Sequence, residues 1–400
     1  MKINKHCFPN GLRLVHYEDT STQMVALNIV YDVGARDEQP EHTGFAHLFE
    51  HLMFGGSAHI PDYDTPLQLA GGENNAWTNN DITNYYLTVP KPNVETAFWL
   101  ESDRMLELAF SEQSLEVQRG VVMEEFKQRC LNQPYGDVGH LFRPLAFRVH
   151  PYRWPTIGKE LSHIEQATLD EVKSFFYRFY APNNAVLAVT GNISWDETVK
   201  LTEKWFAPIP RRDVPVRQLP QEPEQTQERR LTVERNVPLD ALFMGYHMCS
   251  REGADYYAFD ILSDILSNGR SSRLNRRLVQ EQNIFSGIDA YISGTRDAGL
   301  LQISGKPAAG VSLEQAEAAV RKELEELQRS PVDGQELEKV KNKFESTQIF
   351  GNINYLNVAT NLAWFELTGK AEDIDLEVER YRSVTTEQLH TVAQRTFCES

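Results

Sequence analysis

The chain is interrupted near its middle by a segment, residues 208–228, that is rich in proline, glutamine and charge and poor in large apolar side chains. Proline removes backbone donors and favours extended conformations, so this composition is typical of a linker. A chain of 400 residues is also longer than one ordinary hydrophobic core requires. We therefore predict two domains, residues 1–212 and 229–400, joined by a linker at 213–228.

Each half begins with the same order of patterns: two strand-like segments, then an apolar helix that ends at glycine. In the first half these are residues 11–19, 24–36 and 44–56, and in the second half 229–236, 241–253 and 256–269. Further amphipathic helices are expected at 93–109, 112–131, 168–179 and 312–329, and a further strand at 184–193. The pattern predicts an α+β fold with two similar domains, each a largely antiparallel sheet packed with helices.

The helix predicted at 44–56 carries the most informative residues of the chain. Apart from His47, Glu50 and His51, its residues 45–54 are all apolar, which is typical of a buried helix. The three polar residues are spaced i, i+3 and i+4 and so share one face. Burying them is costly unless they are satisfied, and a divalent metal would do so. The alternative is a chance triplet whose histidines form hydrogen bonds in the core. The order is HxxEH, the inverzincin motif, with Glu50 as general base.

Catalytic zinc usually has three protein ligands, so a third must come from elsewhere in the chain. The best candidate lies in the helix around 118–126, where two adjacent carboxylates follow an apolar run. Glu124 shares a helical face with Val117 and Val121 and is the first choice. Glu125 points about a quarter-turn away and is the fallback.

The first half resembles the pitrilysin/insulinase family of metallopeptidases, which includes the subunits of mitochondrial processing peptidases. The resemblance rests on HxxEH together with ordered segments around it, among them NNAWTNNDITNYY, VVMEEF, HPYRWPTIG and FYRFYAPNNAVLAVTGNI. It implies a metallohydrolase fold and one Zn²⁺ per chain, held by His47, His51 and Glu124. It also implies that an edge strand beside the zinc binds extended substrate through Asn75, Ala76, Trp77 and Thr78.

The chain departs from this family in two places. Many members carry a supporting carboxylate seven residues before the third ligand, where this chain has Val117, with Glu116 next to it. Active relatives often present an Arg and a Tyr from the second half, where the nearest matches here are Val279 and Phe285, and Arg277 fits only in a shifted register. The second half also lacks the metal motif, since Asp260, Ser263 and Asp264 stand at the corresponding positions.

Together these features predict a zinc-dependent endopeptidase that hydrolyses unfolded peptides or oligopeptides. The alternative is a non-catalytic or half-site subunit of the same fold that needs a partner chain. The resemblance implies that two such chains enclose the substrate, so we expect a homodimer or a heterodimer with a related chain. A purely structural zinc is a third possibility, but such sites normally use four protein ligands.

The composition excludes several other functions. A formal net charge of −17 repels nucleic acid and anionic lipid, so neither is an expected partner. The four cysteines are scattered without a CxxC pair, which is typical of reduced thiols in a reducing compartment. Neither an apolar leader nor a membrane-spanning stretch is visible in the sequence, and a cytoplasmic location is predicted.

Overall fold

The computed structural model describes residues 1–398, which divide into two compact units. Unit 1 contains Met1–Glu222 and Phe350–Asp375, and unit 2 contains Pro223–Ile349 and Leu376 onward. The first boundary lies inside the predicted linker. The division is not sequential, however, because residues 350–375, predicted in the second domain, belong to unit 1. No helix within residues 1–398 combines the length and apolarity needed to cross a bilayer.

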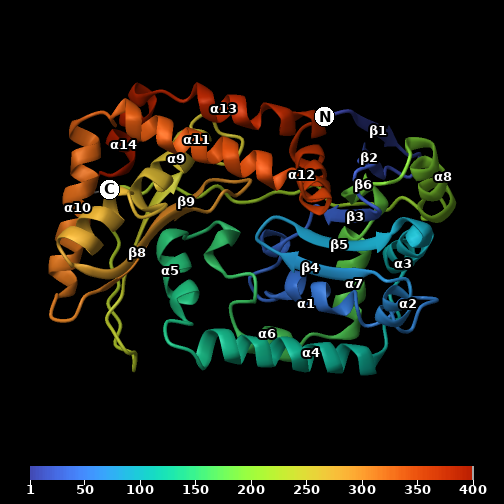
Figure 1. Ribbon diagram of the computed structural model, residues 1–400. Helices are drawn as coiled ribbons and strands as arrows, with labels where there is room; N and C mark the ends of the chain where they lie inside the picture. Colours follow the sequence, from blue (N-terminus) through green and yellow to red (C-terminus); the bar gives the residue numbers. More distant parts are fainter. Residues whose placement is uncertain (399–400) are drawn as a thin grey trace. The chain divides into compact units, whose positions relative to one another are not determined.

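A six-stranded, mostly antiparallel sheet forms the centre of unit 1 (Figure 1). Only the β2–β6 pair is parallel. The strand order is β1 (Ile3–Cys7), β2 (Arg13–Glu18), β6 (Ala185–Gly191), β3 (Met24–Tyr31), β5 (Thr83–Pro90) and β4 (Glu73–Thr78). β4 therefore lies at an edge, paired with β5 alone. The expected strand at 184–193 is present as β6.

One face of this sheet packs on the helices that follow β3 and on α7 and α8, in a large apolar core. The helices of this region are α1 (Phe45–Leu52), α2 (Asp64–Leu69), α3 (Val94–Leu106), α4 (Glu112–Phe126), α5 (Val138–Ala146), α6 (Leu161–Glu165), α7 (Leu169–Phe179) and α8 (Trp195–Phe206). The π-helical turn η3 (Lys127–Leu131) continues α4. The predicted helices at 93–109, 112–131 and 168–179 correspond to α3, to α4 with η3, and to α7.

The other face of the sheet is covered by α12 (Tyr355–Thr368), which comes from late in the chain (Figure 1). Its buried side chains recur at helical spacing, which gives the helix one apolar stripe. They pack on small and branched residues of the central strands: Val358, Ala359, Leu362 and Ala363 meet Val15, Ala26, Val30, Val186 and Ala188. The sheet of unit 1 is thus a buried middle layer, and its edge strand β4 lies on the side of α1.

Unit 2 has a smaller antiparallel sheet of three strands in the order β7 (Leu242–Met248), β9 (Gly299–Pro307), β8 (Phe285–Ile292). Its helices are α9 (Tyr256–Ser267), α10 (Leu313–Arg329), α11 (Gly334–Gly351, whose last two residues belong to unit 1), α13 (Glu377–Ser383) and α14 (Thr386–Thr396), with a π-helical segment η6 (Asn275–Glu281). The strand predicted at 229–236 is wrong. That segment has no regular structure, its apolar residues Leu231 and Val233 are exposed, and Arg230 pairs with Glu317 of α10.

The linker is tied to both units. The carboxylate of Glu222 accepts backbone N–H bonds from residues 148, 149 and 150 at 2.7, 2.9 and 3.0 Å. Within unit 2, Glu228 pairs with Arg321 at 3.0 Å. Only residues 223–227 lie between these two attachments. The segment that joins the units without such a tie is therefore shorter than the predicted 213–228.

Candidate metal centre

α1 carries the HxxEH residues and begins at a glycine that the local geometry requires. Gly44 precedes the helix with a φ of +88°, which favours glycine, and a Cβ there would lie 2.7 Å from Ile164 Cδ1. Glycine has no side chain with which to cap the helix. The carboxylate of Glu38 does so instead, accepting the backbone N–H of Gly44 and of Ala46 at 2.9 Å each.

The remaining face of α1 is apolar and anchors the helix in the core. Phe45, Leu48, Phe49 and Leu52 are buried, and Phe49 stacks on Phe175 with ring centroids 5.0 Å apart. His47 and His51 therefore project from the opposite stripe. Their rings meet edge to face with centroids 4.9 Å apart.

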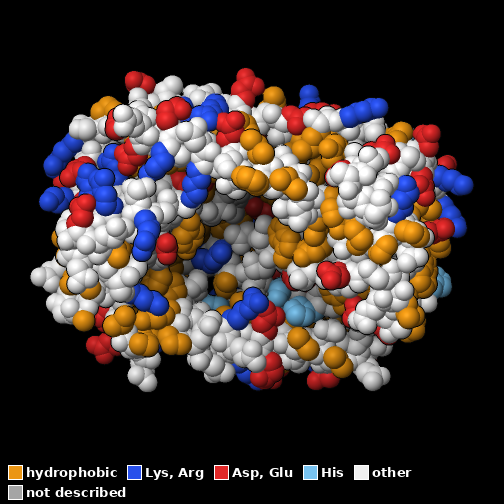
Figure 2. All heavy atoms as spheres, in the orientation of Figure 1, with side chains coloured by type: hydrophobic (Ala, Val, Ile, Leu, Met, Phe, Trp, Pro, Cys, Tyr) orange, Lys and Arg blue, Asp and Glu red, His pale blue; other side chains and the backbone are white. Residues whose placement is uncertain are grey.

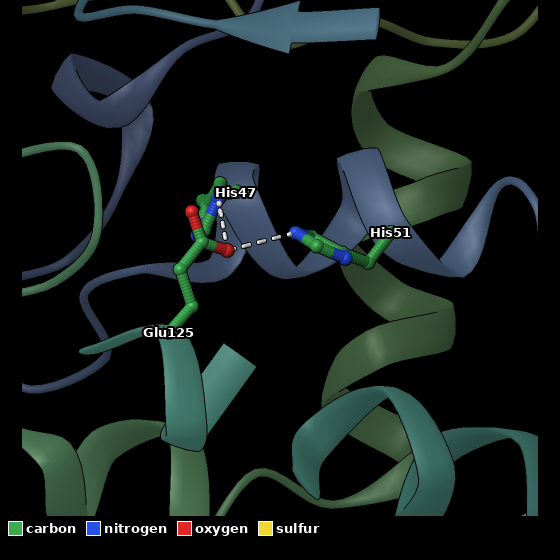
Figure 3. A group of neighbouring side chains, drawn as sticks. All are labelled: His47, His51 and Glu125. Carbon is green, nitrogen blue, oxygen red and sulfur yellow. Dashed lines mark ion pairs between the residues drawn. The ribbon is translucent and has the colours of Figure 1, made fainter. Parts of the chain in front are cut away.

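A carboxylate from α4 faces both imidazoles (Figure 3). Glu125 Oε2 lies 3.4 Å from His47 Nε2 and 3.3 Å from His51 Nε2. One potential ligand atom from each of these residues lies within 4.8 Å of the others. Two imidazoles and one carboxylate are a donor set that catalytic zinc uses, with the fourth position left for water or substrate. The residues of this centre therefore fit a zinc ion.

The structure corrects the choice of Glu124 as the third ligand. Its side chain is 62% exposed and pairs with Lys127 at 2.5 Å, whereas that of Glu125 is 19% exposed. The prediction took Val117 and Val121 to mark the inner face of the helix, but both are exposed. The buried face carries Leu115, Val122 and Phe126, and Glu125 follows Val122 by three residues.

The supporting carboxylate expected at Glu116 is also absent from the centre. Glu116 is exposed and pairs with Arg119 at 2.8 Å, one turn further along the surface of α4. With Glu125 in place of Glu124, the position seven residues earlier is Gln118, which is partly buried. An amide thus stands where many family members place a carboxylate.

Burial shapes the protonation of the centre. It lowers the pKa of His47 to about 4, so this imidazole is neutral at neutral pH and able to bind a metal. A hydrogen bond with His51, together with the nearby His47 and Arg129, lowers the pKa of Glu125 against the effect of burial. Histidine side chains reach the surface beside acidic and basic side chains (Figure 2). The buried Nδ1 of His47 has no hydrogen-bond partner in residues 1–398, which leaves Nε2 as the atom directed at Glu125.

Glu50 lies on the same stripe of α1, one turn after His47. Burial raises the pKa of its carboxyl, while a hydrogen bond with Thr78 of β4 and the neighbouring His51 lower it. A partly buried carboxyl held in this way is suited to accept and return a proton.

The predicted substrate segment is divided between the two faces of the edge strand β4. Ala76 and Thr78 are partly buried, and Ala76 packs on the core below α1. Asn75 and Trp77 are exposed on the other face. Because β4 pairs only with β5, its outer backbone edge is available for an added strand.

Comparison with known proteins places this centre in a family. The family model described as Insulinase (Peptidase family M16) matches residues 13–137, and that described as Peptidase M16 inactive domain matches residues 166–344. The chain belongs to the M16 peptidase family. The resemblance inferred from the sequence motifs is thereby confirmed, as is the two-domain α+β fold.

Relatives of this M16 chain are named zinc proteases. It is 29% identical to the zinc protease PqqE of Helicobacter pylori, over 83% of this chain and 76% of that protein. It is 24% identical to the uncharacterized zinc protease YmxG of Bacillus subtilis, over 99% and 96% of the two chains. The crystal structure of a protease from Helicobacter pylori matches with a TM-score of 0.93 and 26% identity, over 100% of this chain and 97% of that one.

A structure of twice the length also shares the fold. The periplasmic protease PqqL from Escherichia coli matches all of this M16 chain with a TM-score of 0.79 and 19% identity, but only 46% of that protein is covered. The present chain thus corresponds to about half of that molecule.

Unit 2 of the M16 chain holds no second metal centre among its described residues. On α9, Asp260 accepts a hydrogen bond from the Tyr381 hydroxyl at 2.5 Å, and Ser263 donates to the Asp260 carbonyl. Asp264, the third residue at the motif positions, accepts a hydrogen bond from Asn268. A hydrogen-bonded network therefore replaces the metal ligands.

The positions compared with the Arg and Tyr of active relatives are occupied by core or paired residues. Phe285 is fully buried, and Val279 packs on the core of unit 2. Arg277 is engaged by Glu323 at 2.6 Å and by Glu326. Within the described part of unit 2, these positions therefore offer neither a free Arg nor a Tyr to a substrate.

Sequence reasoning missed two residues next to the centre: Glu38, which caps α1, and Arg129, which pairs with Glu125 at 2.8 Å. The first had a signal in the sequence, since a helix that begins after glycine needs an acceptor for its first N–H groups. Arg129 lies four residues after Glu125 and so shares its face of the helix. The choice of Glu124 as the ligand left no sequence signal that pointed to Arg129.

Proposed function

We propose that this M16 chain is a zinc-dependent endopeptidase. The observation that carries the proposal is the convergence of His47 Nε2, His51 Nε2 and Glu125 Oε2 beside Glu50 and an open edge strand. The names of the relatives support zinc as the metal. We assign His47, His51 and Glu125 as the ligands of one ion per chain.

Hydrolysis requires a nucleophile, a proton acceptor and a path for the proton to the leaving amine. Zinc, when bound, would polarise the scissile carbonyl and the attacking water. Glu50 accepts the proton of that water and delivers it to the departing nitrogen. Its hydrogen bond with Thr78 keeps the carboxyl oriented, and its partly buried position restricts competing solvent.

The substrate side of the proposal rests on β4. An extended peptide can add to its free edge by main-chain hydrogen bonds, which are largely independent of side-chain identity. Asn75, Ala76, Trp77 and Thr78 would line this added strand, with Asn75 as a polar contact. Since a folded protein has few free strands to offer, we expect unfolded peptides or oligopeptides to be the substrates.

A half-site subunit is the second candidate function. It is favoured by the absence of the Arg and Tyr features from unit 2 and by the match of residues 166–344 to a domain described as inactive. A homodimer or a heterodimer with a related chain would then complete the site. The intact centre in unit 1 favours the peptidase, alone or within such a pair.

The test combines metal analysis with cleavage of a quenched fluorescent peptide, for wild type, Glu50→Gln and the exposed control Glu41→Gln. We expect one zinc per chain in all three and turnover lost only in Glu50→Gln. If the chain binds one zinc but cleaves the peptide only after a related chain is added, the half-site subunit is the better hypothesis. Absence of bound zinc, or undiminished cleavage by Glu50→Gln, would overturn the proposal.

The predicted cytoplasmic location stays a prediction, since a structural neighbour, PqqL, is a periplasmic protease. Fractionation of cells that produce the protein, with marker proteins for each compartment, tests it.

A further inference from the structure

The two carboxylate oxygens of Glu125 have different partners. Oε2 lies between the two imidazoles, at 3.4 and 3.3 Å from their Nε2 atoms, whereas Oε1 pairs with the guanidinium of Arg129 at 2.8 Å. The carboxylate is therefore held at both ends: one oxygen faces the metal centre and the other faces a cation.

The position of Arg129 follows from the way α4 ends. The helix passes directly into the π-helical turn η3, and Arg129 lies in that turn, four residues after Glu125. The neighbouring cation Lys127 pairs instead with Glu124, which points away from the centre. Two cations of one turn, Lys127 and Arg129, thus pair with the adjacent carboxylates Glu124 and Glu125, and only the Arg129 pair touches the metal centre.

A role in fold stability does not account for this contact. The side chain of Arg129 is 68% exposed, and an exposed pair at this spacing adds little to stability. Within residues 1–398 its guanidinium makes one ion pair, with Glu125. A guanidinium presents its donors in a fixed fork, so it can fix the orientation of a carboxylate plane.

We infer that Arg129 is a positioning residue of the metal centre: by engaging Oε1 it makes Glu125 a one-oxygen ligand and keeps a coordination position open. This inference rests on the proposed zinc site. Without Arg129, the carboxylate is free to turn and offer both oxygens to the metal. The second oxygen would then occupy the position that water or the scissile carbonyl requires.

The test compares Arg129→Met and Arg129→Lys with Lys127→Met, a control that removes one positive charge from the same turn. Zinc affinity is measured by competition with a chromophoric chelator, and coordination by the visible absorption of the Co²⁺-loaded protein. Cobalt absorbs more weakly when its coordination number rises above four. We expect weaker absorption for Arg129→Met, with zinc affinity changed less than about tenfold.

Turnover of a fluorescent peptide should fall about 10- to 100-fold in Arg129→Met with KM nearly unchanged, a common size of effect for groups that orient metal ligands. Arg129→Lys should recover part of it, and Lys127→Met should match wild type in every measurement. An Arg129→Met protein with the cobalt spectrum of Lys127→Met would overturn the inference. If the wild-type protein binds metal but cleaves no peptide, the proposed function is refuted, and the cobalt spectra still test the role of Arg129. If the wild-type protein binds no metal, both the proposed function and the inference on Arg129 are refuted.

Discussion

Glu38 offers a test of how the fold holds the metal helix in place. Its buried carboxylate accepts the N–H groups of Gly44 and Ala46, at the first turn of α1. His47 is the next residue of that turn. Replacing Glu38 by alanine removes both acceptors while leaving every proposed metal ligand in the chain.

The expected cost follows from the two donors left behind. A buried donor without a partner costs about 1–3 kcal/mol, so Glu38→Ala should destabilise unit 1 by about 2–6 kcal/mol. For a unit of about 250 residues, each kcal/mol lowers the melting temperature by about 2–4 °C, which makes a fall of about 8–16 °C for a loss of ~4 kcal/mol. Glu38→Gln keeps one acceptor and should lose about half as much.

The assay is thermal unfolding of the zinc-free protein, followed by circular dichroism at about pH 6. Burial raises the pKa of Glu38 from its ordinary value of 4.5 to about 8, against the two N–H donors, so at pH 6 the carboxyl must take up a proton when the protein folds. That uptake opposes folding, and it places the expected fall for Glu38→Ala at the lower end of the range. The control is Glu41→Ala, which alters an exposed carboxylate of the same loop. Zinc affinity should also fall, because fraying of the first turn displaces His47. A melting temperature within about 2 °C of the control, with unchanged zinc affinity, would refute this account of the cap.

Three further predictions address the ligand, unit 2 and the linker. Glu125→Gln should lower zinc affinity by at least about tenfold while Glu124→Gln leaves it unchanged, as measured by chelator competition; the reverse order would restore the original ligand choice. Burial raises the pKa of Asp260 to about 6, so its contribution to stability is full below about pH 3.8 and is lost as the pH rises through 6. Asp260→Asn should therefore remove up to about 3 kcal/mol of pH dependence from denaturant unfolding, and identical pH profiles would contradict this. Glu222→Ala should speed hydrogen exchange at residues 148–150 about tenfold for each ~1.4 kcal/mol of hydrogen bonding lost, and unchanged exchange there would show that this tie is weak.

The elements predicted from the sequence are those whose own side chains determine the structure. The helix at 168–179 has a regular apolar stripe, and the metal triplet stands out because its helix is otherwise apolar. The prediction of a strand at 229–236 failed because this segment, despite its alternating pattern, does not pair with a strand in the described part of the chain. Its arginine is instead used in an ion pair with α10.

The choice between Glu124 and Glu125 failed for a related reason. Adjacent residues on a helix differ by a quarter-turn, and the sequence alone did not reveal which valines of α4 were buried. Val117 and Val121 are exposed and Val122 is buried, a difference set by the packing of α4 rather than by residue type. The cap on α1 depends on Glu38, a residue outside the helix. The placement of residues 350–375 on unit 1 depends on contacts between segments that are far apart in the chain.

The return of α12 to the first sheet has a consequence for synthesis. The strands of unit 1 are complete once β6 has been made, but the helix that covers their second face follows only after the 127 residues of 223–349. At about 5–20 residues per second, the ribosome needs roughly 6–25 s to make them. During that interval the apolar residues Ala26, Val30, Val186 and Ala188 stay open to water and to other nascent chains. In a fragment that ends at residue 222, this apolar face of the sheet would stay uncovered, because α12 would be missing.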